Sequence, residues 1–176
     1  ASARLEDLDA CFRVNVAVPI FLHGWLCRRA PAGARLRVVD VSSGAADTPY
    51  PGWVSYCASK AALDMAGRVL AVELDEVQAA KGRDVSVVSY APGVVATRMQ
   101  EQIRAADEHE FPRRERFVRL HDDGELVDPA GPAAEIAGLL ARDDLPPFSR
   151  QRFAGGAPEG AARRGRAARR ALPPAD

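Results

Sequence analysis

The sequence predicts an α/β fold in which long helices connect the strands of a parallel sheet. Two short β-branched runs, Arg35–Val41 (RLRVVDV) and Asp84–Tyr90 (DVSVVSY), are typical of strands buried on both faces. A helical pattern of more than twenty residues precedes each run, at 4–29 and at 53–80. Crossovers of this length indicate parallel strands, because the chain must return to the same end of the sheet.

Proline and glycine residues mark the ends of these helices. In the first helix, residues 4–29, Pro19 should introduce a kink, and Pro31-Ala32-Gly33 should end the segment. The second helix, residues 53–80, should be closed by Lys81-Gly82, which puts a cation in the last turn and a glycine at the cap.

The rest of the chain predicts smaller elements. We expect the charged run 106–116 to form short helices and a mobile loop over the site, as a substrate lid does. A helix should span 132–141 and a last short strand 148–153. Beyond Gly155 the chain is rich in alanine, arginine, glycine and proline, so we expect one domain over residues 1–154 and a disordered tail over 155–176.

Composition excludes several classes of function. Hydrophobic residues make up 47% of the chain and charged residues 27%, as in a globular protein with its own core. The net charge is zero, and five arginines gather after residue 160, so the body of the chain gives no reason to expect nucleic-acid binding. No cysteine or histidine follows metal-ligand spacing, which favours reduced thiols in the cytoplasm and no metal. We also expect no apolar run as long as a membrane span.

Tyr56 and Lys60 form the motif that carries chemistry. Residues four apart on a helix share one face, so the lysine cation should lower the pKa of the phenol and make it a usable proton donor. Ser43 could steady the oxygen atom that receives this proton. Together these side chains suit the reduction of a carbonyl group or its reverse.

The fold itself predicts that these side chains meet. Ser43 follows the first predicted strand, and Pro92-Gly93 follows the second. Tyr56 begins the helix between the two strands. Because ligands bind beyond the carboxyl ends of parallel strands, we expect all of these groups at one edge of the sheet.

Taken together, these motifs resemble the short-chain dehydrogenase/reductase family over roughly residues 5–153. Its catalytic tetrad is matched by Asn15, Ser43, Tyr56 and Lys60, with the family's usual thirteen-residue step from serine to tyrosine. The sequence around Tyr56 and around the turn that begins at Pro92 further resembles the sepiapterin reductases and the bacterial benzil reductases.

The resemblance implies a role for each residue of the tetrad. Tyr56 would be the general acid, Lys60 would lower its pKa and bind the nicotinamide ribose, and Ser43 would hold the substrate carbonyl. Asn15 would anchor a water that links Lys60 to solvent; a buried asparagine that caps a kink at Pro19 is the alternative.

The implied cofactor is NADP, with NAD as the alternative. Thr97 would bind the nicotinamide carboxamide through its hydroxyl group, and it could also cap the following helix. The residues expected to bind the cofactor are Tyr56, Lys60, Pro92, Gly93, Val95 and Thr97.

The chain departs from the family at the nucleotide end. It contains no Gly-x-x-x-Gly-x-Gly segment, so we expect a partial doubly wound, Rossmann-type sheet that lacks the N-terminal nucleotide-binding βαβ half, as in a truncated fragment. Two functions stay open. One is an NADP(H)-dependent reductase of a diketone or pteridine-type carbonyl, expected to be a homodimer through its two long helices. The other is a non-catalytic binding or regulatory protein on a degenerate form of the fold.

Overall fold

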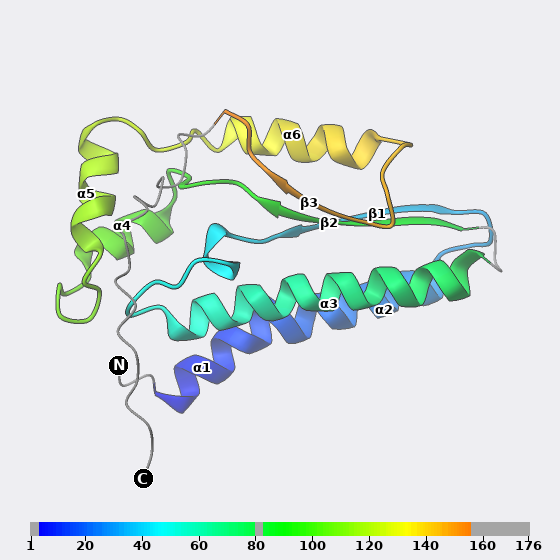
Figure 1. The fold of residues 1–176 in the computed structure, drawn as a ribbon, viewed down its shortest axis with the longest axis horizontal. Coiled ribbons are helices and arrows are strands. Elements are labelled where there is room, and N and C mark those ends of the chain that lie inside the picture. Colours follow the sequence, from blue (N-terminus) through cyan, green and yellow to red (C-terminus); the bar gives the residue numbers. More distant parts are fainter. Residues whose placement is uncertain (1–3, 80–82, 156–176) are drawn as a thin grey trace, which may run out of the picture.

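The structure, a computed structural model, describes residues 4–79 and 83–155 and confirms the predicted parallel α/β fold. One sheet holds the strands β1 (Arg35–Val41), β2 (Asp84–Ala91) and β3 (Phe148–Arg152) in that order, all parallel (Figure 1). The helices are α1 (Leu5–Phe12), α2 (Val18–Arg29), α3 (Val54–Ala79), α4 (Arg98–Ala105), α5 (Arg114–Asp122) and α6 (Ala130–Ala141). The predicted closing pair Lys81-Gly82 and the predicted tail from residue 156 onward lie outside the described residues.

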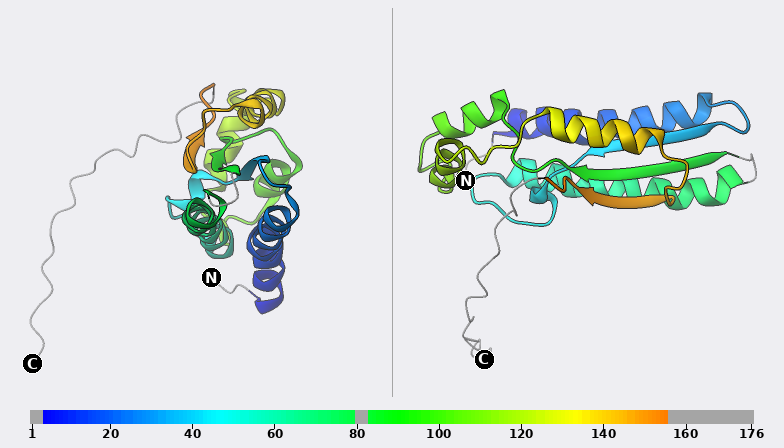
Figure 2. Two further views of the ribbon diagram at one scale, coloured as in Figure 1. Left: turned by 90° about the vertical axis from the view of Figure 1, so that its right-hand side faces the viewer. Right: turned by 90° about the horizontal axis from the view of Figure 1, so that it is seen from above.

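The central strand β2 forms the core between two layers of helices. Val87, Val88 and Tyr90 are 0% exposed. Val88 and Tyr90 pack with Leu139 of α6, whereas Val87 faces Gly67 of α3. Figures 1 and 2 show α6 on one face of the sheet and α2 with α3 on the other. Burial on both faces explains why this strand is a continuous β-branched run.

The first helix is continuous from α1 to α2 and contains a π-helical turn at Arg13–Ala17. In this turn the Val18 N–H donates to the Arg13 carbonyl, five residues back. Pro19 has no N–H, so the carbonyl of Asn15 has no donor at the α-helical spacing. The distortion expected at Pro19 therefore takes the form of a π-turn just before it.

Helix α3 begins after a tight turn at Tyr50-Pro51-Gly52-Trp53, closed by a 3.0 Å bond from the Trp53 N–H to the Tyr50 carbonyl. Gly52 has φ of +87°, and a Cβ atom there would lie 2.4 Å from the carbonyl oxygen of Glu110. Glycine is therefore required at this position for both conformation and space.

The smaller elements match their predictions closely. Helix α6 begins at Ala130, two residues before the predicted start, because the Asp128 carboxylate accepts from the Ala130 N–H at 2.8 Å and caps it. The last strand ends at Arg152, one residue earlier than predicted. Helices α4 and α5 lie beyond the carboxyl ends of the strands (Figure 1), where the lid was expected.

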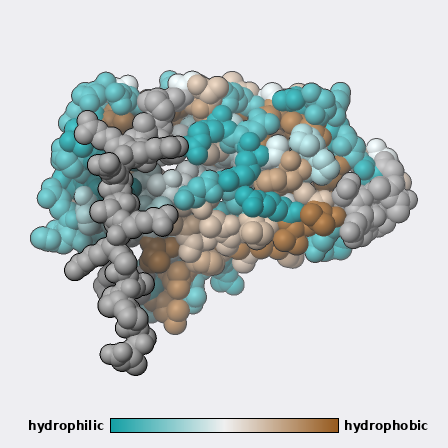
Figure 3. All heavy atoms as spheres, viewed as in Figure 1, coloured by the Kyte–Doolittle hydropathy of each residue, from teal (hydrophilic) through white to brown (hydrophobic). Residues whose placement is uncertain are grey.

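The expectation that no apolar run is as long as a membrane span is wrong. By length and composition, the continuous helix Leu5–Arg29 could cross a membrane, with a mean hydropathy of 1.4 over its best window, of which 11% is buried. Figure 3 shows apolar surface over α1 and the neighbouring part of α3. Exposed apolar side chains on this helix include Leu5, Val14, Phe21, Leu22 and Trp25. Strand β1 is also an edge strand of the described sheet.

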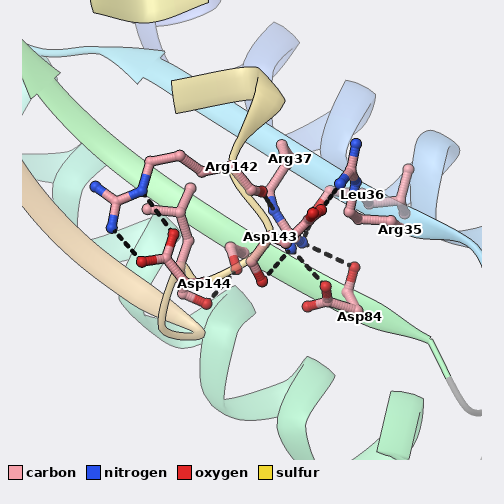
Figure 4. A network of polar contacts seen from close by, with 9 residues as sticks. Arg35, Leu36, Arg37, Asp84, Arg142, Asp143 and Asp144 are labelled. Carbon is pink, nitrogen blue, oxygen red and sulfur yellow. Dashed lines mark hydrogen bonds and ion pairs between the residues drawn. The ribbon is translucent and has the colours of Figure 1, made fainter. Parts of the chain in front are cut away.

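A polar network closes the end of the sheet away from the strands' carboxyl ends (Figure 4). The Arg37 guanidinium donates to the carbonyls of Arg142 and Asp143, at 2.9 and 3.2 Å, and pairs with the Asp84 carboxylate at 2.5 Å. The Arg37 side chain is only 3% exposed. Because one guanidinium joins β1, β2 and the loop after α6, it fixes these three segments to one another.

The packing predicts different effects for two neighbouring leucines of α6. Leu139→Ala should lower the free energy of unfolding by about 2–5 kcal/mol, because it empties a site packed against β2. Leu140 is 45% exposed, so Leu140→Ala should cost less than about 1 kcal/mol and serves as the matched control. Urea denaturation measures both values. Equal losses would contradict this account of the core.

The Arg37–Asp84 pair predicts a dependence of stability on pH. A hydrogen bond from Arg37 lowers the pKa of the Asp84 carboxyl below its usual value. A depressed pKa gives stability that is present above the unfolded-state pKa of about 3.9 and is lost as the pH falls through the folded-state pKa. Between pH 5 and pH 2, Arg37→Met should therefore lose less unfolding free energy than the unsubstituted chain.

The matched control for Arg37 is Arg4→Met. Arg4 pairs with Asp7 in a fully exposed position, so this substitution should leave both the stability and its pH dependence nearly unchanged. Urea midpoints at a series of pH values measure both effects. If Arg37→Met and Arg4→Met show the same dependence of stability on pH, the role given to the Arg37–Asp84 pair of Figure 4 is wrong.

Candidate functional site

The carboxyl ends of β1 and β2 and the start of α3 open onto one cavity of about 390 Å³. Of the eight residues predicted from the sequence, seven line this cavity: Ser43, Tyr56, Lys60, Pro92, Gly93, Val95 and Thr97. Asn15 does not line it. The structure thus brings together the residues from three separate segments, and their chemical roles stay predictions.

Ser43 lies two residues after the end of β1 and lines this cavity. It has an extended backbone and caps a short 3₁₀ turn, where its Oγ atom accepts from the Ala45 N–H at 3.1 Å. Because the oxygen acts as acceptor in this bond, the hydroxyl proton can be donated to a ligand. A serine in this state suits a carbonyl oxygen as its partner.

Lys60 is fixed beside Tyr56. Its Nζ atom donates to the Val41 carbonyl at 2.8 Å and lies 5.8 Å from the centre of the Tyr56 ring. Burial lowers the pKa of Lys60, and the charges of Cys11, Asp40 and Asp64 oppose this shift. A partly desolvated cation at this distance interacts strongly with a phenol that loses its proton.

Asn15 reaches the site indirectly, through α3. Its Nδ2 atom donates to the Ser59 Oγ atom at 3.1 Å, and the Ser59 hydroxyl donates to the Tyr56 carbonyl at 2.9 Å. Ser59 is fully buried. The side chain of Asn15 therefore ties the π-turn to the first turn of α3, and its amide group bonds to α3 rather than capping a kink at Pro19.

The turn after β2 presents backbone to the cavity. Gly93 has φ of +80°, the left-handed region that favours glycine. The next residues pair with a segment before α6: the Val127 N–H donates to Val94 and the Ala96 N–H donates to Val127, each at 2.9 Å. Thr97 is the N-cap residue of α4, but its hydroxyl makes no capping bond. This hydroxyl is available to a ligand at the cavity wall.

An aromatic wall, defined as Tyr50, Trp53, Phe111 and Phe117, borders the cavity: Tyr50, Trp53 and Phe117 line it, and Phe111 stacks on Trp53. Trp53 stacks on Phe111 with ring centres 4.8 Å apart and planes 7° apart, and it meets the Tyr56 ring edge-on at 5.3 Å. Phe111 and Phe117 are each 3% exposed. Phe111, inside the run 106–116 that was predicted to form a mobile lid, and Phe117 of α5 are thus buried in one cluster.

Sequence reasoning missed most of this wall and the two buried acids Asp40 and Asp64. Phe111 and Phe117 lie too far along the chain from Trp53 for any local pattern to connect them to it. His23 and Asp40 form a buried pair at 2.9 Å that the sequence did not reveal. Across residues 4–79 and 83–155, no group of three or more possible metal ligands occurs.

A family described as short chain dehydrogenase matches residues 1–108. Among curated relatives, a benzil reductase ((S)-benzoin forming) from Bacillus subtilis is 35% identical over 141 residues, which cover 80% of this chain and 56% of that protein. A sepiapterin reductase from Rattus norvegicus is 41% identical over 111 residues, covering 63% of this chain and 39% of that protein. The chain spans about half the length of the curated relatives it matches.

Solved structures agree with this assignment. The KRED1-Pglu enzyme matches with a TM-score of 0.70 and 27% identity, over 84% of this chain and 60% of that chain. The angucycline C-6 ketoreductase LanV with bound NADP matches with a TM-score of 0.64 and 25% identity, over 88% of this chain and 55% of that chain. The chain belongs to the short chain dehydrogenase family of oxidoreductases.

Proposed function

We propose that this short chain dehydrogenase reduces the carbonyl group of an apolar, aromatic substrate such as a diketone, with NADPH as the reductant. The observation that carries the proposal is the meeting of Ser43, Tyr56 and Lys60 on one cavity with an aromatic wall. The names of the benzil reductase relatives and of the NADP-bound ketoreductase support the substrate class and the cofactor. A pteridine-type carbonyl, supported by the sepiapterin reductase relatives, is the second candidate substrate, and NAD is the alternative cofactor.

The polar groups of the cavity would act on one oxygen atom. The Ser43 hydroxyl would donate a hydrogen bond to the substrate carbonyl, and the Tyr56 phenol would transfer its proton to the same oxygen. Lys60 would stabilise the phenolate left behind, because its cation lies beside the ring. The aromatic wall would bind the apolar part of the substrate and exclude water from the reacting atoms.

The residues present fit the nicotinamide end of the cofactor. At Gly93 a positive φ and the missing side chain let backbone approach a flat ring closely, and the Thr97 hydroxyl has no capping partner. Pro92, Gly93, Val95 and Thr97 would therefore hold the carboxamide, with Tyr56 and Lys60 at the ribose. When bound, NADPH supplies a hydride to the carbonyl carbon.

Asn15 would contribute through its backbone. Pro19 leaves the Asn15 carbonyl without a donor at the α-helical spacing, and the Asn15 side chain is already bonded to Ser59. This carbonyl would accept a hydrogen bond from a water that returns protons to Tyr56 by way of Lys60.

The direct test is NADPH oxidation with benzil as substrate. Tyr56→Phe should lower kcat/KM by about 10²–10⁴-fold, the contribution of a general acid. Tyr90→Phe makes the same chemical change in the core, outside the cavity, and should keep kcat/KM within a few-fold of the unsubstituted chain. Turnover that survives Tyr56→Phe would contradict the proposed role of this phenol.

The second function that stays open is that of a non-catalytic binding or regulatory protein. The chain contains no Gly-x-x-x-Gly-x-Gly segment, the usual cradle for the cofactor pyrophosphate. Titration calorimetry with NADPH separates the two functions. Binding together with benzil-dependent turnover supports the reductase, whereas no heat of binding and no turnover support the non-catalytic protein.

We also infer a homodimer through the two long helices. The exposed apolar side chains Phe21 on α2 and Met65, Val69 and Val72 on α3 are 49–62% exposed and would be covered by a second copy. Sedimentation equilibrium should give about twice the chain mass of 18.9 kDa. Val72→Asp should shift it to the monomer, and Leu140→Asp, on the opposite layer, should not. A monomeric unsubstituted chain would overturn the inference.

We infer a cytoplasmic setting for this reaction. Cys11, Cys27 and Cys57 are all free thiols, which supports a reducing compartment.

A further inference from the structure

Asp64 is a buried acid on α3, one helical turn after Lys60 and only 5% exposed. Its Oδ1 atom accepts from the Ser42 hydroxyl and from the Ser89 hydroxyl, each at 2.6 Å. Burial of a carboxylate is costly unless hydrogen bonds and charge compensate for the lost water. Two short bonds, one from the residue after β1 and one from β2, provide such compensation.

The other oxygen of Asp64 faces a cation from the third strand. A guanidinium nitrogen of Arg150 lies 2.9 Å from Oδ2 and also pairs with Asp47, in the loop after Ser43. One carboxylate thus joins α3 to the residue that follows β1, to β2 and to β3, and through Arg150 to the loop that carries the serine of the site.

The two serines held by Asp64 lie in or close to the segments that line the cavity: Ser42 lines it, and Ser89 lies three residues before Pro92. Ser42 is followed by Ser43, and its N–H donates to the Tyr90 carbonyl at 2.7 Å. Ser89 is followed within four residues by Gly93 of the cavity turn. We propose that Asp64 is a positioning residue of the reductase site, whose charged carboxylate fixes the exits of β1 and β2 and holds a negative charge one turn from Lys60. This inference rests on the proposed function.

Asp64 also affects the charge state of Lys60. The groups that face Lys60 are Tyr56 on its own helix, Cys11 on α1, Asp40 on β1 and Asp64. Of these, Asp40 is paired with His23 of α2, and Asp64 with Arg150 of β3. Burial lowers the pKa of Lys60, and Asp64 is one of the charges that raise it. Removal of that charge should therefore lower the pKa of Lys60 further.

Two substitutions separate geometry from charge. Asp64→Asn keeps an oxygen that can accept from both serines but removes the negative charge and presents N–H groups to Arg150. Asp64→Glu keeps the charge but changes its reach. Glu73→Gln neutralises an exposed acid on the same helix and is the matched control. Circular dichroism and urea midpoints establish that each variant is folded before the comparison.

The first measurement needs no enzymatic activity. The chain has two lysines, so acetic anhydride labelling followed by mass spectrometry reports the titration of Lys60, with Lys81 as the internal reference. Asp64→Asn should lower the pKa of Lys60 by about half a unit or more, because two charges one helical turn apart interact even when partly screened. Glu73→Gln should leave it unchanged. An unchanged Lys60 titration in Asp64→Asn would overturn the inference.

The second measurement is the pH profile of benzil reduction. Asp64→Asn should lower kcat at least ten-fold with little change in KM, and its profile should shift in the same direction as the Lys60 titration. Asp64→Glu should have the pH profile of the unsubstituted chain, with a kcat between those of Asp64→Asn and the unsubstituted chain. If the unsubstituted chain has no turnover, the proposed function fails and the labelling experiment alone decides the role of Asp64. If it turns over and Asp64→Asn matches it in kcat and profile, the inference fails while the proposed function stands.

Discussion

The parallel pairing of β1 with β2 is the constraint on which the rest of the structure depends. The strands pair from Arg35 opposite Asp84 to Val41 opposite Tyr90, so both end at the same edge of the sheet. The connection between them must travel back along the full length of the strands, and α3 does so. Its first turn therefore lies at the edge where both strands end, which is why Tyr56 meets the serine loop and the glycine turn.

Polar groups inside the layer between the sheet and the long helices set the positions of these elements. Apolar contacts tolerate small sliding motions, whereas a buried charge loses several kcal/mol if its partner moves away. Asp40 is paired with His23 of α2, and Asp64 accepts hydrogen bonds from Ser42, just after β1, and from Ser89 of β2. Lys60 lies between these two acids, so the same bonds that fix the layer also set the electrostatic surroundings of the site.

The parts of the fold that the sequence predicted are those with a local pattern. The runs 35–41 and 84–90 predict strands, of which β2 is buried as expected while β1 is only partly buried at the sheet edge. The meeting of Ser43, Tyr56 and Gly93 follows from the strand ends alone. The aromatic wall and the Asp64 contacts depend on pairs of residues many positions apart, and periodicity contains no information on such pairs. The π-turn was hidden for another reason: Pro19 indicates that a helix is disturbed but not which hydrogen bonds replace the lost one.

In the first helix, a few polar side chains join a long apolar segment to the α/β unit, which length and hydropathy alone do not reveal. Cys11, Asn15, Pro19 and His23 recur every four residues, so they follow one another along a single side of the helix. Asn15 bonds across to Ser59 of α3, and His23 bonds to Asp40 of β1. A helix apolar enough to span a membrane is thereby joined to the α/β unit along one polar line. Since Ser59 also bonds to the Tyr56 carbonyl, that line ends at the first turn of the site helix. The position of the phenol is therefore set from the helix layer as well as from the sheet edge.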